Sequence, residues 1–157
     1  MSVERVTNYL RQYGAADRVL VFEQSSATVE LAAKAVGCEP ARIAKTLSFD
    51  VDGQAILVVT AGDVKIENAK YKARFGAKAK MLTPDDAVTK VGFAVGGVCP
   101  FGVNKGVAIY LDESLKRFDT VFPSGGSDCS AIELSIAELE EYSRSIAWVN
   151  VTKLREI

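Results

Sequence analysis

Residues 45–60, KTLSFDVDGQAILVVT, carry the clearest structural signal in the chain. Apolar and polar residues alternate on both sides of Asp52-Gly53, a pattern typical of two strands joined by a two-residue turn. The stretch therefore predicts a β-hairpin that places Lys45 at the start of its first strand.

The rest of the chain mixes helices and strands without a regular βαβ repeat. Periodicity and capping signals predict helices over residues 2–13, 28–36, 66–75 and 135–143, with shorter ones opening at 40 and 83. Strands are expected over 19–23 and from 93, 106, 119 and 130, with an extended segment over 77–82. This order favours an α+β fold around a mixed, largely antiparallel sheet, with a barrel-like shape left open.

Composition is that of an ordinary globular protein, with 48% hydrophobic and 25% charged residues among 157. No linker or internal repeat divides the sequence, so residues 1–157 are expected to form one domain. The apolar runs are too short to span a bilayer, and the first 14 residues are amphipathic rather than signal-like. We therefore expect a cytoplasmic protein without a membrane partner.

The chain contains no histidine, which excludes Ser-His and Cys-His nucleophiles and the common histidine zinc sites. The cysteines Cys38, Cys99 and Cys129 are too widely spaced to suggest a metal or redox motif. Phosphate-loop and dinucleotide fingerprints are also missing. Any catalysis must use lysine, carboxylates, hydroxyls, a thiol, backbone dipoles or groups of the substrate.

The segment VGGVCPFG, residues 95–102, concentrates glycine and proline between two strand-like stretches. Glycine permits positive φ and close approach of a ligand, so such a loop can present backbone N–H groups to a carbonyl or an oxyanion. A plain tight turn is the alternative interpretation. A second small-residue loop, Ser124-Gly125-Gly126, fits either a hairpin connection or the wall of a pocket.

Lys45 either reaches the surface along its aliphatic stem or points into a cleft. Together with the two loops, it would complete a pocket for an anionic or ester-bearing ligand. A separate basic segment, residues 65–80, holds six basic groups against one acid. It fits either a phosphate contact or an ordinary solvated helix face.

The order AKTLSF, VGGVCPFG and PSGGSDCSAIEL resembles the YbaK and prolyl-tRNA editing-domain family of aminoacyl-tRNA deacylases. The similarity extends from about Val19 to Tyr142. It implies a YbaK-like fold and hydrolysis of the ester on a mischarged tRNA, typically prolyl-tRNA carrying a small non-cognate amino acid. No metal or organic cofactor is implied. The implied partners are tRNA and prolyl-tRNA synthetase.

The resemblance also implies roles for particular residues. Lys45 would position the terminal adenosine, and the backbone of Gly96, Gly97 and Val98 would bind the ester. The remaining residues of the implied substrate pocket are Cys99, Pro100, Phe101, Ser124, Gly125, Gly126 and Ala131. The tRNA contacts are expected from the charge of the basic segment and not from the resemblance, and they are Lys65, Lys70, Lys72 and Arg74.

Two positions depart from the family pattern and affect the expected amino-acid specificity. Cysteine-editing relatives carry an acid near Ala131, whereas this chain has Asp128 three residues earlier. Cys99 stands where some relatives have serine. Two other functions remain open from the residues, namely a non-catalytic module that binds a tRNA end and a hydrolase that uses Cys99 as its nucleophile.

Overall fold

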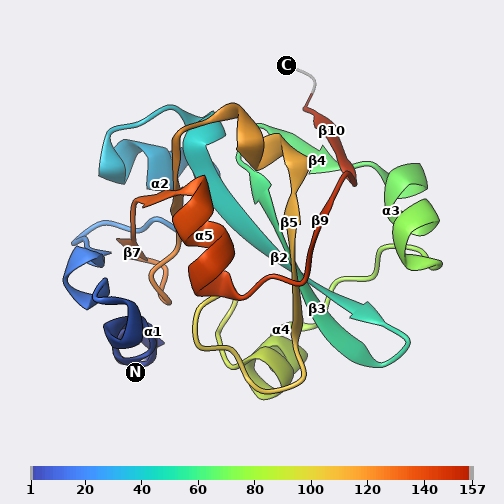
Figure 1. The fold of residues 1–157 in the computed structure, drawn as a ribbon, viewed down its shortest axis with the longest axis horizontal. Helices are drawn as coiled ribbons and strands as arrows, with labels where there is room; N and C mark the ends of the chain where they lie inside the picture. The colour runs from blue at the N-terminus through green and yellow to red at the C-terminus, as the bar shows by residue number, and fades with distance from the viewer. Residues whose placement is uncertain (1, 156–157) are drawn as a thin grey trace.

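The predicted hairpin forms the centre of the fold (Figure 1) in the computed structural model, which describes residues 2–155. Strand β2 (Ile43–Val51) pairs antiparallel with β3 (Gln54–Ala61) across the Asp52-Gly53 turn. Both turn residues have positive φ, 51° and 85°, as a two-residue hairpin requires. The hairpin is thus confirmed, and β2 begins two residues before Lys45.

The hairpin belongs to a six-stranded mixed sheet of order β8-β6-β2-β3-β5-β9. Its other strands are β5 (Ala108–Asp112), β6 (Thr120–Pro123), β8 (Leu134–Ser135) and β9 (Ala147–Val149). The β2–β6, β3–β5 and β5–β9 pairings are parallel. The mixed sheet of the predicted α+β class is confirmed. When the two strand pairs of the next paragraph are included, four of the seven strand pairings in residues 2–155 are antiparallel.

Two small antiparallel pairs lie outside the main sheet. Strand β1 (Leu20–Val21) pairs with β7 (Ser130–Ala131), and β4 (Val64–Ile66) pairs with β10 (Thr152–Leu154). The first pair joins the segment before α2 to the loop that follows β6. Strands β4, β9 and β10 have only three residues each, too few to give a periodic signal in the sequence.

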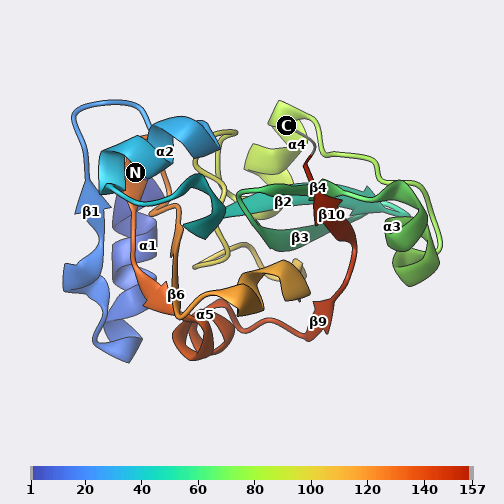
Figure 2. The same cartoon turned by 90° about the horizontal axis from the view of Figure 1, so that it is seen from above.

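Within residues 2–155, five α-helices surround the sheet: α1 (Ser2–Leu10), α2 (Val29–Val36), α3 (Asn68–Phe75), α4 (Pro84–Asp86) and α5 (Ile136–Ser143). The predicted capping box is present, because Ser135 and Glu138 bond each other's backbone N–H at the start of α5. Figure 2 shows α2 and α4 on one side of β2 and β3 and α5 on the other, with α1 and α3 toward opposite ends.

Apolar residues are buried on both faces of the hairpin. Ala44, Leu57 and Val59 belong to the main core, which α1, α5 and the residue 93–101 segment complete. Phe49 and Ile56 face a smaller core under α3, where Tyr71 is fully buried. Burial on both faces explains why β3 is buried at every position after Gln54.

One strand prediction is wrong. Residues 93–97 form a loop rather than a strand, because Gly96 has a φ of 94° and the Gly97 N–H closes a turn onto the Ala94 carbonyl at 3.0 Å. The extended 77–82 segment contributes only the Met81 bridge to Phe49. The loop of residues 93–97 lies beside the cavity described below.

Candidate active site

A cavity of about 290 Å³ opens where β2, the segment before α2 and two loops meet. It brings together five of the residues predicted from the sequence: Lys45, Gly96, Val98, Ser124 and Ala131. They come from β2, from the VGGVCPFG loop and from the segment that follows β6. The lining also includes apolar side chains from α2, β2 and β6, namely Val29, Ala32, Ile43, Leu47 and Phe122.

The cavity lies at a gap in the sheet. Strand β6 pairs with β2 only at Ile43 and Ala44. Farther along, the segment around Met81 takes the same edge, because the Leu82 N–H donates to the Ser48 carbonyl and the Asp50 N–H to the Lys80 carbonyl. Within residues 2–155, β2 has no strand neighbour on this edge between residues 45 and 47.

Lys45 borders this gap and is half-buried. Its Nζ donates a hydrogen bond of 2.5 Å to the Val64 carbonyl of β4. Burial lowers the pKa of Lys45, and the nearby charge of Arg155 lowers it further, against a smaller opposing effect of Asp63 and Glu30. The ammonium group is therefore held at the cavity by the fold, and its proton is easier to remove than in water.

The two small-residue loops contact each other through their backbones. A β-carbon on Gly97 would lie 2.7 Å from Ser127 Cα and 2.8 Å from the Gly126 carbonyl oxygen. Ser124 fixes the second loop, because its Oγ accepts from the Gly126 N–H at 3.1 Å and donates to the Ser127 carbonyl at 3.2 Å. Only residues without a side chain allow this approach.

This packing bears on the predicted role of the Gly97 backbone, which stays a prediction. Its N–H already donates to Ala94, and Gly97 is buried under the second loop rather than among the residues that line the cavity. The residues of this loop that line the cavity are Val95, Gly96 and Val98. Gly125 and Gly126 are likewise buried and do not line the cavity, so they support its wall.

Cys99, Pro100 and Phe101 also lie beneath the loop, and none of them lines the cavity. Burial raises the pKa of the Cys99 thiol to about 12, and the side chain is fully inaccessible. A thiol in that state is neither ionised at neutral pH nor open to a substrate. The structure therefore contradicts the alternative in which Cys99 is the nucleophile.

Comparison with known proteins identifies the family. A sequence model of the aminoacyl-tRNA editing domain matches residues 23–142, which include β2, both loops and the cavity. This chain belongs to the aminoacyl-tRNA editing domain family. The predicted resemblance is thereby confirmed at the level of the family.

Individual relatives in this family fall into two groups by length. An uncharacterized protein of Bacillus subtilis, YwhH, is 50% identical over 154 residues, 98% of each chain. The proline–tRNA ligase of a Geobacillus strain is 31% identical over 90 residues, which are 57% of this chain but 16% of the ligase. A candidate trans-editing enzyme for prolyl-tRNA synthetase has a solved structure with a TM-score of 0.87, 29% identity and 97% coverage of both chains.

The predicted tRNA contacts of this editing domain lie outside the lining of the cavity, although Lys65 directly follows Val64, whose carbonyl accepts the hydrogen bond from Lys45 Nζ. Lys65 is on β4, and Lys70, Lys72 and Arg74 are on α3, toward the opposite end of the molecule from α2 (Figures 1 and 2). Lys70 Nζ donates to the Thr152 carbonyl at 2.8 Å, and the Arg74 guanidinium lies 5.3 Å from the centre of the Tyr110 ring. None of the four lines the cavity.

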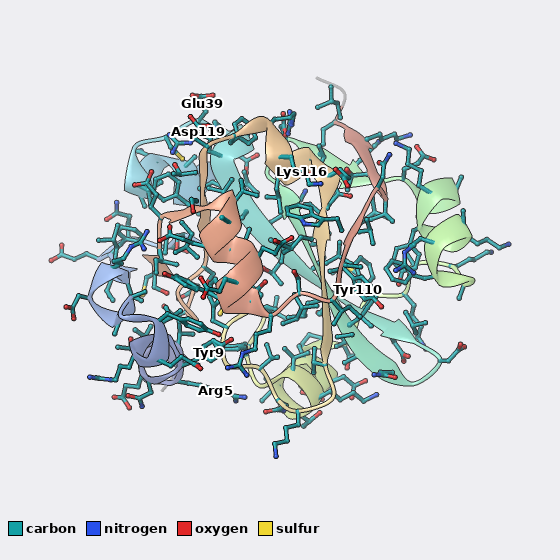
Figure 3. The ribbon with its side chains drawn as sticks, viewed as in Figure 1. Arg5, Tyr9, Glu39, Tyr110, Lys116 and Asp119 are labelled. Atoms are coloured by element: carbon teal, nitrogen blue, oxygen red, sulfur yellow. The ribbon has the colours of Figure 1, made fainter. Side chains whose placement is uncertain are left out.

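Sequence reasoning missed Arg5, which holds the VGGVCPFG loop from α1. Its guanidinium donates to the Gly102 carbonyl at 2.5 Å and to Asn104 Oδ1 at 2.8 Å, and it lies over the Phe93 ring. Figure 3 labels Arg5 and Tyr9 on α1, at the end of the molecule where this loop passes. No local pattern links residue 5 to residues 93–104, so the sequence held no signal for this contact.

Residues 2–155 contain neither a candidate metal site nor a candidate membrane-spanning helix. No cluster of three His, Cys, Asp or Glu side chains is arranged to hold a metal ion. No helix in the described part of the chain has the length and apolar character needed to cross a membrane.

Proposed function

We propose that this editing domain is a free-standing deacylase that hydrolyses the ester between a small non-cognate amino acid and the 3′ end of a tRNA, with proline tRNA as acceptor. The observation that carries the proposal is the convergence of Lys45 with Gly96 and Val98 on one cavity. Membership of the family and the likeness to a candidate trans-editing enzyme support it.

In the proposed reaction, water attacks the ester carbonyl carbon, and the bond to the ribose oxygen breaks. The negative charge that develops on the carbonyl oxygen would be met by backbone N–H groups of the Gly96–Val98 segment. The water proton ends on the ribose oxygen, and a neighbouring ribose hydroxyl of the substrate relays it. Lys45 holds the terminal nucleotide so that the ester reaches the loop.

The shape and lining of the cavity support a small amino acid as the group removed. A volume of about 290 Å³ has to accept the aminoacyl group together with part of the terminal nucleotide. The side chains from α2 and β6 that line it are apolar, and Lys45 is its one charged lining residue within residues 2–155. A charged amino-acid side chain would lose its hydration there without a partner.

The proposal also includes the partner, the compartment and the groups that the reaction uses. The domain would act in trans on tRNA released by prolyl-tRNA synthetase, in the cytoplasm. It would use groups of its own chain and of the substrate, without a metal or an organic cofactor.

The test uses purified protein and a panel of tRNAs charged with alanine, cysteine, serine, threonine or proline. We expect the ester on at least one small non-cognate amino acid to be hydrolysed well above the spontaneous rate, in buffer that contains EDTA. Tight binding of a charged tRNA without hydrolysis of its ester would instead identify a non-catalytic binding module. EDTA-sensitive hydrolysis that is restored by a divalent cation would contradict the cofactor-free reaction.

A further inference from the structure

The antiparallel pair of β4 and β10 forms a ribbon that adjoins the cavity. Lys45 Nζ donates to the Val64 carbonyl of β4 at 2.5 Å, and Leu154 of β10 is the register partner of Val64. Figures 1 and 2 show the two strands side by side, between α2 and α3. Strand β10 lies outside residues 23–142, which the family model matches. The ribbon therefore brings residues from beyond the matched region to the candidate site.

The exposed face of this ribbon carries three cations. Lys65 and Lys153 are direct register partners, so their side chains leave the same face. The Arg155 N–H donates to the Asp63 carbonyl at 3.0 Å, which extends the ladder and places Arg155, two residues after Lys153, on that face as well. All three basic side chains are exposed. Like charges directly opposite each other on neighbouring strands are destabilising, so the Lys65–Lys153 pair is unfavourable for the fold alone.

The carboxylates of the ribbon are already held by other cations. Asp63 accepts two hydrogen bonds from the Arg117 guanidinium, at 2.9 and 2.5 Å. Glu67, which follows β4, forms an ion pair of 3.1 Å with Lys153. These acids therefore do not neutralise the remaining cations of the face.

Two of the three exposed cations have no carboxylate partner. Lys65 and Arg155 form no ion pair within residues 2–155. The charge of Arg155 also reaches the cavity, because it is the largest cause after burial that lowers the pKa of Lys45. An anion close to both groups would be attracted by both charges and would offset their repulsion.

We propose that the β4–β10 ribbon binds the phosphodiester backbone at the 3′ end of the tRNA. The inference rests on the proposed function and adds a path for the substrate. With the terminal adenosine held by Lys45, the phosphate that joins it to the preceding nucleotide would lie at Arg155. Lys65 and Lys153 would continue the path toward the body of the tRNA. Phosphate is the anion that this surface would meet, because the ester in the cavity is attached to a phosphodiester chain.

The test is a binding experiment with two non-hydrolysable ligands, measured by calorimetry at several salt concentrations. One is 3′-alanylamino-3′-deoxyadenosine, which has no phosphate, and the other carries the same group on the trinucleotide cytidylyl-cytidylyl-adenosine. We expect the wild-type protein to bind the trinucleotide more tightly. Arg155→Gln should weaken the trinucleotide about two- to fivefold and reduce its salt slope by about 0.7, the value for one phosphate on a single strand.

The nucleoside without phosphate should bind equally well to the wild type and to Arg155→Gln. The matched control is Arg11→Gln, which removes an exposed arginine on the far side of the chain from the ribbon and should leave both ligands unaffected. Equal weakening of both ligands by Arg155→Gln, or an unchanged affinity and salt slope for the trinucleotide, would overturn the inference.

Thermal unfolding adds an independent readout on the opposed lysines. Lys65→Gln removes the repulsion of Lys153 without breaking an ion pair described in residues 2–155, so its midpoint should stay the same or rise by about 1–2 °C. The same variant should weaken the binding of full-length tRNA, whereas Lys105→Gln should not. A lowered midpoint with unchanged tRNA binding would show that Lys65 serves stability and would remove it from the path.

The two proposals fail separately. If the trinucleotide binds as expected and Arg155→Gln weakens it, but no charged tRNA is hydrolysed, the ribbon stands and the proposed catalysis falls. If charged tRNA is hydrolysed but the trinucleotide binds no better than the nucleoside, the ribbon falls and the proposed function stands. If neither ligand binds at millimolar concentration, the ribbon falls, whatever the deacylation assay shows.

Discussion

Gly97 and Ser127 come from two different loops, and a β-carbon on residue 97 would lie 2.7 Å from the α-carbon of Ser127. That distance is too short for any side chain, so the loops can meet only through a glycine at position 97. Gly96, Val98 and Ser124 all line the cavity, so this contact joins two loops that contribute to its wall.

Gly97→Ala should therefore force the loops apart. We expect a decrease of about 1–3 kcal/mol in the free energy of unfolding, as for overpacked sites. Deacylation should fall by at least about tenfold, because displaced donors no longer meet the developing oxyanion. Urea unfolding and single-turnover kinetics measure the two effects.

Gly14→Ala serves as the control for the replacement of a glycine. Gly14 has a φ of 68° and open space around it, so alanine there costs about 1–2 kcal/mol of backbone strain without a clash. Its kinetic constants should match those of the wild type. Wild-type kinetics in Gly97→Ala would mean that the contact between the loops does not shape the site.

Arg5→Ala should loosen the VGGVCPFG loop from α1. The variant leaves the Gly102 carbonyl and Asn104 without their donor, which should cost about 2 kcal/mol. Amide hydrogen exchange should accelerate over residues 92–104, and kcat should fall. Arg11→Ala is the matched control, since Arg11 is exposed and its guanidinium donates to the nearby Asn8 side chain. Unchanged exchange in Arg5→Ala would show that the loop holds its shape without α1.

Cys99 should resist iodoacetamide in the folded protein, whereas the partly exposed Cys38 and Cys129 should react. Cys99→Ala should deacylate within about tenfold of the wild-type rate, because the thiol does not reach the cavity. Peptide mapping after alkylation locates the labelled thiols. An acyl group trapped on Cys99, together with an inactive Cys99→Ala, would restore the nucleophile hypothesis.

The raised pKa of Cys99 also predicts a pH dependence of stability. The unfolded thiol ionises above its ordinary pKa of 9.0, whereas the buried thiol stays neutral to about 12. Burial of the neutral thiol thus contributes stability that is complete below pH 9 and is lost as the pH rises from 9 to 12. The stability difference between the wild type and Cys99→Ala should shrink over that range. A constant difference would mean that the thiol titrates normally in the fold.

The sequence was sufficient for the parts of the site that lie on strong local signals. Asp52-Gly53 fixed the hairpin and with it the place of Lys45 in β2. The glycine-rich loops were visible by composition. What the sequence could not show was which groups of those loops face outward. The Gly97 N–H is occupied by Ala94 in a turn, and Cys99 is buried, and both facts depend on how the loop packs against residues 124–127.

Arg5 was beyond prediction for a related reason. Arg5 meets its partners across 97 and 99 residues. Contacts of this range follow from the topology, which local patterns do not determine.

The basic residues Lys65 and Lys72 are exposed, and we predict that they contact the tRNA body. Lys65→Gln with Lys72→Gln should raise the KM for charged tRNA and reduce its salt dependence by about one unit of slope for each phosphate that is no longer neutralised. A minimal aminoacyl-adenosine substrate should be unaffected. The control is Lys105→Gln, which replaces an exposed lysine in the segment that precedes β5. Equal effects on both substrates would mean that these lysines form an ordinary solvated face.

We propose that Lys45, whose Nζ donates to the Val64 carbonyl at the cavity, is required for ester hydrolysis by this domain. The most direct test compares wild type, Lys45→Met and the control Lys105→Met in single-turnover hydrolysis of the charged tRNA that the wild type hydrolyses fastest. Because burial lowers the pKa of Lys45, its charge is disfavoured in the fold, so Lys45→Met should keep or raise the thermal midpoint at pH 7. We predict that its rate falls by at least about a hundredfold, while Lys105→Met retains the wild-type rate. A folded Lys45→Met protein that hydrolyses the ester at the wild-type rate would show that Lys45 has no role in the reaction.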